Sequence, residues 1–190
     1  MNRDDRSRNT QEVSASQLLT VLRGLMGAGK TTLATSLAET SPNIAVVCRD
    51  TIREINFHRD GLLSRDEEDI VSGIEMAQVV EHLDMGRNVI VDATHLDPDH
   101  VQRWVALARA RAIELVLVDV LAPVDVCIAN VKRRKNQGGR DVDPRVIRDA
   151  HRRHPPSSWS PPATFTIGSS TPTHSNHRAP RGRGRNSTAK

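Results

Sequence analysis

A glycine-rich segment near the start of the chain has the residue types needed to hold a row of phosphates. The pattern G-x-x-x-x-G-K-S/T is matched by residues 24–31, Gly-Leu-Met-Gly-Ala-Gly-Lys-Thr. Glycines let consecutive backbone N–H groups point at phosphate oxygens, and a helix beginning at the lysine adds its positive N-terminal dipole. We expect Lys30 to reach the β- and γ-phosphates of a nucleoside triphosphate and the Thr31 hydroxyl to hold Mg²⁺. The loop residues expected to bind the nucleotide are Gly24, Gly27, Ala28, Gly29, Lys30, Thr31 and Thr32.

Apolar runs alternate with helical stretches along the middle of the chain. The runs are rich in Val, Ile and Leu, as buried strands are, and lie at 18–22, 44–48, 88–92 and 114–120. The helices expected between and after them lie at 31–39, around 70–80, at 98–111, and from Pro123 and Pro144 onward. Continuous apolar strands alternating with helices are typical of a parallel sheet covered on both faces. We therefore predict a three-layer α/β fold of the P-loop NTPase class for residues 17–154.

Two aspartates follow predicted strands, at the sheet edge where parallel sheets bind ligands. Asp50 comes after the second strand and Asp92 closes the third. A carboxylate close to the γ-phosphate can accept the proton of an attacking hydroxyl group. Arg53 lies one helical turn after Asp50, where it could orient that carboxylate or bind a phosphate of the acceptor. A purely structural ion pair between Asp50 and Arg53 is the alternative.

The motifs that are missing narrow the class of phosphate-loop protein. The Asn-Lys-x-Asp segment with which GTPases read their base does not occur, and Asp92 is followed by Ala93 rather than by a second acidic residue typical of motor ATPases. A small phosphotransferase is the class that these observations favour.

The combination of motifs resembles the kinase domain of phage polynucleotide 5′-hydroxyl kinases. It consists of the phosphate loop, Arg-Asp-x-x-Arg after the second strand, Asp-x-Thr-x-Leu-x-Pro after the third, and a basic segment before the last helix. The resemblance covers residues 18–154. It implies that Asp50 is the general base on the 5′-hydroxyl group and that Arg53 contacts the adjacent phosphate of the acceptor.

The same resemblance implies roles for the remaining motif residues. Asp92 and Thr94 would line the acceptor channel, and Lys30 would act on the phosphates of ATP. The implied cofactors are ATP and Mg²⁺, with Thr31 as a ligand of the metal and Asp92 as a further candidate.

A lid arginine is also implied, because family members use one to stabilise charge on the transferring phosphoryl group. Position favours Arg133 as a catalytic residue, whereas Arg134 and Arg140 remain alternatives. Arg133 and Arg134 are candidates for nucleotide binding as well. Cations at the end of a helix also complement its dipole, and some of the three could do only that.

Charge and composition separate the two ends from the middle of the chain. The net charge is +4, and residues 155–190 hold five basic residues, no acidic residue and six of the ten prolines. We expect residues 1–16 and most of this basic tail to be disordered, apart from a possible edge strand at 163–167. The arginines and glycines of residues 181–185 resemble segments that bind nucleic acid through charge, and a merely solubilising tail is the alternative.

The expected partners are 5′-hydroxyl ends of DNA or RNA. No apolar run reaches the ~18–20 residues of a membrane helix and no secretion signal is evident, so we expect a cytoplasmic protein, in a host cell if a phage encodes it. A homo-oligomer is possible. Two alternative functions are a kinase of the same fold that acts on a small-molecule hydroxyl group and a nucleic-acid-stimulated ATPase without a phosphoryl acceptor.

Overall fold

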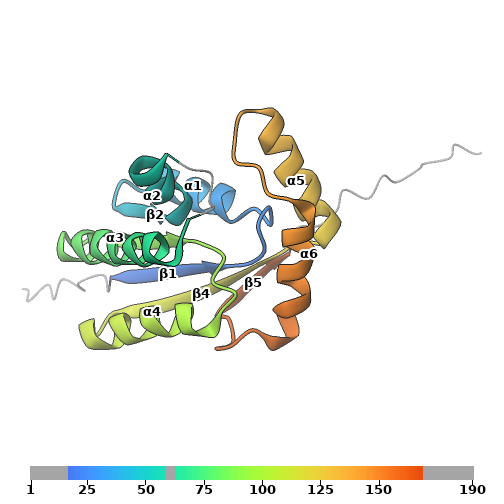
Figure 1. Cartoon of the computed structure of the whole chain (residues 1–190). Coiled ribbons are helices and arrows are strands. Elements are labelled where there is room, and N and C mark those ends of the chain that lie inside the picture. The colour runs from blue at the N-terminus through green and yellow to red at the C-terminus, as the bar shows by residue number, and fades with distance from the viewer. Residues whose placement is uncertain (1–16, 59–62, 169–190) are drawn as a thin grey trace, which may run out of the picture.

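The computed structural model describes residues 17–58 and 63–168, which form a parallel sheet covered by helices (Figure 1). The sheet has the strand order β2-β3-β1-β4-β5, and every neighbouring pair is parallel. Its strands are β1 (Leu18–Arg23), β2 (Ile44–Cys48), β3 (Asn88–Asp92), β4 (Glu114–Leu121) and β5 (Phe165–Gly168). Because all five strands run the same way, their carboxyl ends share one edge of the sheet.

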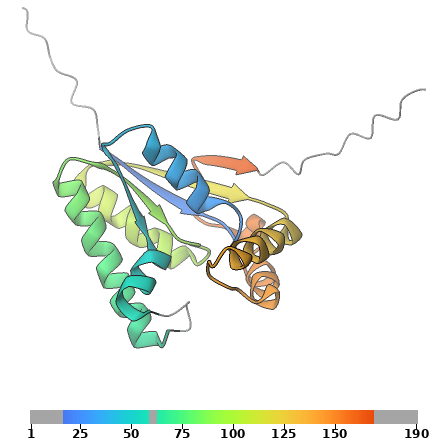
Figure 2. The same cartoon turned by 90° about the horizontal axis from the view of Figure 1, so that it is seen from above.

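Helices cover both faces of the sheet and its carboxyl edge. They are α1 (Lys30–Glu39), α2 (Arg49–Phe57), α3 (Arg65–Asp84), α4 (Pro98–Arg111), α5 (Val124–Asn136) and α6 (Pro144–Arg153), and a short 3₁₀ turn follows at Pro156–Ser158. One buried cluster joins the sheet to α2, α3 and α4, and a second joins it to α1, α5 and α6. In Figure 2, α1 (blue) and α3 (green) lie on opposite sides of the sheet. In Figure 1, α5 and α6 stand at the end of the sheet where β1 and β4 finish.

The sequence explains where several helices begin. Ser64 caps α3 through a reciprocal pair of hydrogen bonds with Glu67, which satisfies two backbone N–H groups that have no partner inside the helix. Asp97 and Asp143 cap α4 and α6, each followed by a proline at the first helical position. The helix starts predicted at Pro98 and Pro144 are therefore confirmed.

The predicted fold class is also confirmed, with differences at the level of elements. The strands at 18–22, 44–48, 88–92 and 114–120 are present to within a residue, and the edge strand expected at 163–167 is β5, so the sheet takes in residues beyond 154. The helical stretch around 70–80 is the central part of a longer helix, α3, and α2 precedes it. Residues 1–16 and the arginine-glycine segment 181–185 lie outside the described residues. None of the described helices is both long and apolar enough to cross a membrane.

A buried ion pair joins the end of β1 to β4. Arg23 and Asp119 lie opposite each other in the ladder, and the guanidinium donates from Nε to Oδ1 at 2.6 Å and from Nη2 to Oδ2 at 3.0 Å. Arg23 is only 1% exposed, and its guanidinium carbon lies 5.1 Å from the centre of the Trp159 ring. Two parallel charge-assisted bonds to Asp119 therefore fix the position of Arg23, the residue directly before the glycine-rich loop.

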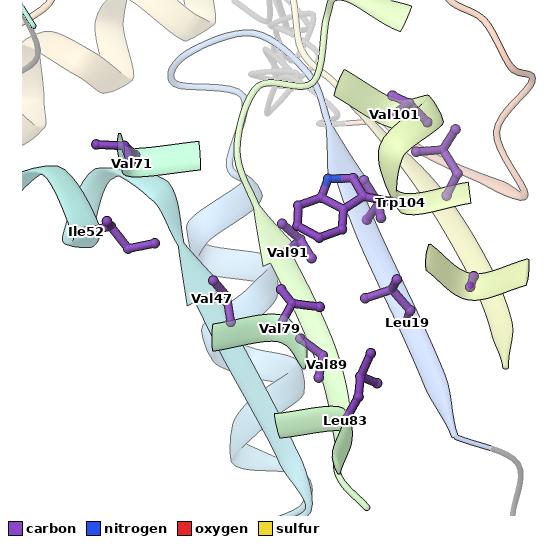
Figure 3. Close-up of a cluster of buried hydrophobic side chains, with 13 residues drawn as sticks. Leu19, Val47, Ile52, Val71, Val79, Leu83, Val89, Val91, Val101 and Trp104 are labelled. Carbon is purple, nitrogen blue, oxygen red and sulfur yellow. The ribbon is translucent and has the colours of Figure 1, made fainter. Parts of the chain in front are cut away.

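A buried histidine connects the apolar cluster beneath α2, α3 and α4 to β1. Figure 3 shows the Trp104 indole among the aliphatic side chains of this cluster. The indole N–H donates to Nε2 of His95 at 3.0 Å, and Nδ1–H of His95 donates to the carbonyl oxygen of Leu22 at 2.7 Å. Because one ring nitrogen accepts and the other donates, the imidazole is neutral. Burial lowers the pKa of His95 to about 3.

This histidine should make stability depend on pH. Its pKa is lowered from 6.5 to about 3 on folding, so the unfolded chain binds the proton more tightly. Stability from this group is present above pH 6.5 and lost as pH falls toward 3, by about 1.4 kcal/mol per pH unit. Urea unfolding across that range measures the slope. His95→Asn, which keeps a donor and an acceptor and suits the positive φ of 46° at this position, should remove this part of the slope. Equal slopes in both proteins would contradict the assignment.

Candidate functional site

Two adjoining cavities lie at the carboxyl edge of the sheet. The first, about 290 Å³, is bordered by the glycine-rich loop, the residues after β2 and β3, the start of α4 and the loop between α5 and α6. The second, about 300 Å³, lies between the start of α1 and the C-terminal half of α5. Gly27, Thr31 and Arg134 line both. The glycine-rich loop therefore opens toward two compartments.

The loop has the shape of a phosphate cradle. Gly27 has a φ of +82° and packs so closely on α5 that a Cβ atom there would lie 2.3 Å from the carbonyl oxygen of Cys127. The Lys30 ammonium group donates to the carbonyl oxygens of Gly24 and Leu25, both at 2.9 Å, and so folds back over the loop. Burial lowers the pKa of Lys30, against the opposing charges of Asp92 and Asp50. The structure thus places Lys30 where an anion bound in the loop would meet it.

Thr31 and Asp92 meet at the inner end of the loop. The Thr31 hydroxyl donates to Oδ2 of Asp92 at 2.6 Å, although the two residues are 61 positions apart in the sequence. A hydroxyl and a carboxylate beside a phosphate cradle are the protein ligands that hold Mg²⁺ in phosphate-loop enzymes. The side chains of Thr31 and Asp92 therefore suit the Mg²⁺ ion that the sequence implied. Thr94 also borders the first cavity, and its carbonyl oxygen accepts from the Gly24 N–H at 3.0 Å, which ties the loop to the end of β3.

Asp50 lines the first cavity from the first turn of α2. Its Oδ1 accepts from Arg53 at 2.8 Å and from Arg140, in the loop between α5 and α6, at 2.5 Å. The Asp50 side chain is 46% exposed, so the carboxylate remains accessible from the cavity. The predicted neighbours Asp50 and Arg53 do contact each other, and a second arginine that is distant in sequence joins them.

Two glutamates of α3 organise the arginines of this cavity. Glu68 accepts from Arg53 at 3.0 and 2.9 Å and from Arg49 at 2.8 Å, and Glu75 accepts from Arg49 at 2.9 Å and from Arg103. Burial alone would lower the pKa of Arg53 and raise that of Glu68. Their mutual hydrogen bonds outweigh burial, so the pKa of Arg53 is raised and that of Glu68 lowered. Both side chains therefore stay charged.

The three lid candidates occupy different places. Arg133 borders the second cavity and donates to Asn130 at 3.0 Å, Arg134 borders both cavities, and Arg140 borders the first. Nε of Arg134 and Nε of Arg140 are buried without a hydrogen-bond partner among the described residues. Arg134 is thus the candidate that lies between the two compartments.

Sequence reasoning missed several residues that line the cavities. His100 and Arg103 of α4 border the first cavity, and Asn130 of α5 borders the second and donates to the Gly27 carbonyl at 2.9 Å. Thr32, predicted for nucleotide binding, borders the second cavity. The seven-residue spacing of Glu68 and Glu75 within a helical pattern was a signal that could have pointed to a polar stripe facing this site.

Comparison with known protein families identifies the class to which this arrangement belongs. The model described as an AAA domain matches residues 19–157, which includes the glycine-rich loop, both strand-end aspartates and the basic segment before α6. The chain belongs to this AAA domain family. No curated protein matches the sequence.

Solved structures show the same fold in kinases. A chain in the structure of the Pnkp1/Rnl/Hen1 RNA repair complex is 26% identical with a TM-score of 0.66, and the match covers 75% of this chain but only 45% of that one. A putative kinase from Chloroflexus aurantiacus is 21% identical, with a TM-score of 0.60 and coverage of 80% and 88%. The APS kinase CysC of Mycobacterium tuberculosis, in complex with AMPPNP and APS, is 17% identical, with a TM-score of 0.55 and the same coverage. This AAA domain therefore has the P-loop kinase fold.

The contact of Gly27 with α5 can be tested by measuring stability. Gly27→Ala forces a Cβ atom against backbone, so either the loop or α5 must shift, and we expect the free energy of unfolding to fall by about 1–3 kcal/mol. Gly73→Ala is the matched control, because Gly73 lies within α3 with no atom near the added Cβ, and it should gain about 0.5–1 kcal/mol. Urea denaturation measures both. A Gly27→Ala protein as stable as the parent would show that the loop is not held as described.

Proposed function

We propose that this AAA domain is a polynucleotide 5′-hydroxyl kinase, which transfers the γ-phosphate of ATP to the 5′-hydroxyl end of DNA or RNA with the aid of Mg²⁺. The observation that carries the proposal is that Lys30 and Asp50 line the same cavity. A phosphate-loop lysine and an accessible carboxylate would then both face the place where a hydroxyl group would meet a γ-phosphate.

The donor would bind across both cavities. Its triphosphate would follow the glycine-rich loop, with Lys30 at the β- and γ-phosphates, and its nucleoside would extend along Thr32, Asn130 and Arg133 toward the second cavity. Thr31 and Asp92 would hold Mg²⁺, which would supply positive charge to the phosphates of the donor.

The acceptor would enter the first cavity. The 5′-hydroxyl oxygen would attack the γ-phosphorus, the bond from that phosphorus to the β–γ bridging oxygen would break, and ADP would leave. The hydroxyl proton would pass to Asp50, whose Oδ1 is already engaged by Arg53 and Arg140 and whose Oδ2 has no hydrogen bond among the described residues. The transfer then needs no covalent intermediate.

The charge around the cavity supports an acceptor that carries phosphate. Six lysine or arginine side chains line it against three carboxylates. Arg53, next to Asp50, would contact the phosphate adjacent to the reacting 5′-hydroxyl group. Similarity to a chain of an RNA repair complex also supports a nucleic acid as the acceptor.

Of the lid candidates, we propose Arg134 for the transferring phosphoryl group. Arg134 borders both cavities and has a buried Nε without a partner among the described residues. Its guanidinium could therefore follow the phosphoryl group from donor to acceptor. Arg140 would orient Asp50, and Arg133 would bind the donor from the rim.

The direct experiment supplies γ-labelled ATP, Mg²⁺ and a 5′-hydroxyl oligonucleotide, with its 5′-phosphorylated twin as control, in both DNA and RNA forms. Label on the hydroxyl strand alone is the expected result. Label released as free phosphate, with neither strand modified, would overturn the proposal in favour of a plain ATPase or a kinase of small hydroxyl compounds.

Replacing the base should slow the chemical step selectively. Asp50→Asn keeps the shape of the side chain but cannot take the proton, so we expect kcat to fall by about 10²–10⁴ while the affinity for ATP changes little. Steady-state kinetics and equilibrium binding of ATP separate the two effects. An equal loss in both would assign Asp50 a structural role.

The roles proposed for the adjacent residues Arg133 and Arg134 can be distinguished by kinetics. Arg134→Ala should lower kcat by about 10³–10⁵, the contribution of an arginine that stabilises a transferring phosphoryl group. Arg133→Ala, the matched control on the same turn of α5, should chiefly raise the KM for ATP. A larger kcat effect at Arg133 than at Arg134 would reverse the assignment.

A further inference from the structure

A second group of basic side chains borders the first cavity, on the side formed by α4. His100 is exposed near the start of this helix, and Arg103 follows one turn later on the same side. Both border the cavity, and the Arg103 side chain is 23% exposed. Neither residue is needed for the phosphoryl transfer described above.

Arg103 is held in place from behind. Its guanidinium carbon lies 4.5 Å from the centre of the Trp104 ring, and Nη2 donates to Oε2 of Glu75. Glu75 is completely buried, and its Oε2 also accepts from Arg49. One carboxylate therefore serves two guanidinium groups, which leaves excess positive charge on the cavity wall. A buried carboxylate without cations would be costly, so Glu75 and its arginines form a unit.

The two glutamates of α3 bind different sets of arginines. Glu68 and Glu75 are seven residues apart, so they lie on one side of the helix with their backbones separated by about 10 Å. Arg53 is bound to Glu68, Arg103 is bound to Glu75, and Arg49 is bound to both. The Arg49 guanidinium, bound to both glutamates, thus separates the cation beside Asp50 from the one on α4. Two separately held guanidinium groups suit two phosphate groups of one strand rather than a single phosphate.

We propose that Arg103 and His100 bind a second phosphate of the acceptor strand, the next one along from the phosphate at Arg53. This inference rests on the proposed function and specifies its acceptor: a strand with at least two phosphates, in preference to a mononucleotide. Glu75 is the positioning residue, because it fixes the direction of the Arg103 guanidinium without reaching the cavity.

The test compares two acceptors that differ only by the second phosphate. A dinucleoside monophosphate and the same molecule with a 3′-terminal phosphate share both bases and both sugars, and each is used in deoxyribose and ribose form with γ-labelled ATP. We expect kcat/KM to be about ten- to a hundredfold higher for the 3′-phosphorylated acceptor, the range of one charge-assisted hydrogen bond. The difference should lie in the acceptor KM, since this phosphate is remote from the reacting oxygen.

Variants assign the effect to residues. Arg103→Met keeps an unbranched apolar stem beside Trp104 and leaves Glu75 paired with Arg49, and it should remove most of the preference between the two acceptors. The rate with the monophosphate reports whether the protein is folded. His100→Gln, at an exposed position where folding is not at risk, should reduce the preference in part. Arg109→Met, at an exposed position of the same helix that borders neither cavity, is the matched control and should keep it.

The possible failures are distinct. If the parent protein phosphorylates none of the acceptors, including a longer oligonucleotide, the proposed function fails and the second site with it. If it phosphorylates both dinucleotides equally well, or if Arg103→Met lowers both rates by the same factor, the second site is overturned and the proposed function stands.

Discussion

The site depends on the requirement that charged groups at a half-buried sheet edge be paired. An unbroken series of ion pairs meets this requirement, running Arg140, Asp50, Arg53, Glu68, Arg49, Glu75 and Arg103. Removing one member would leave its neighbours partly uncompensated, which costs more than the pair itself contributes. The series joins α2, α3, α4 and the loop between α5 and α6. The same contacts therefore help to fix the positions of these helices and direct guanidinium groups toward the cavity.

A second set of contacts holds the base of the glycine-rich loop. The residue before the loop is fixed by the ion pair of Arg23 with Asp119, the preceding carbonyl of Leu22 is bound by His95, and the first loop amide is bound by Thr94. These three contacts come from β4 and from the segment after β3. The loop is thus anchored on both neighbouring strands, which restricts its motion before any nucleotide arrives. Pre-organisation of this kind reduces the entropy lost on binding.

The sequence was sufficient for the features that depend on local chemistry. Apolar runs predicted the strands, the glycine and lysine pattern predicted the loop, and the spacing of Asp50 and Arg53 predicted their contact. It was not sufficient for pairs formed by folding. Nothing near Arg23 in the chain indicates Asp119, 96 residues later, and nothing near Asp50 indicates Arg140, 90 residues later. Such partners are set by strand order and by the path of the helices, which a single sequence does not encode in any local pattern.

The position of Arg134 between the two cavities has a thermodynamic consequence. One side chain borders both the cavity proposed for the acceptor and the cavity proposed for the donor, so a ligand that orders this side chain from one cavity also changes the other cavity. Binding of the two ligands is then linked by a shared free energy, and the factor by which one changes the affinity of the other is necessarily reciprocal. With both ligands present, the ordering of this arginine is a cost shared between them, which would favour a ternary complex over either binary one.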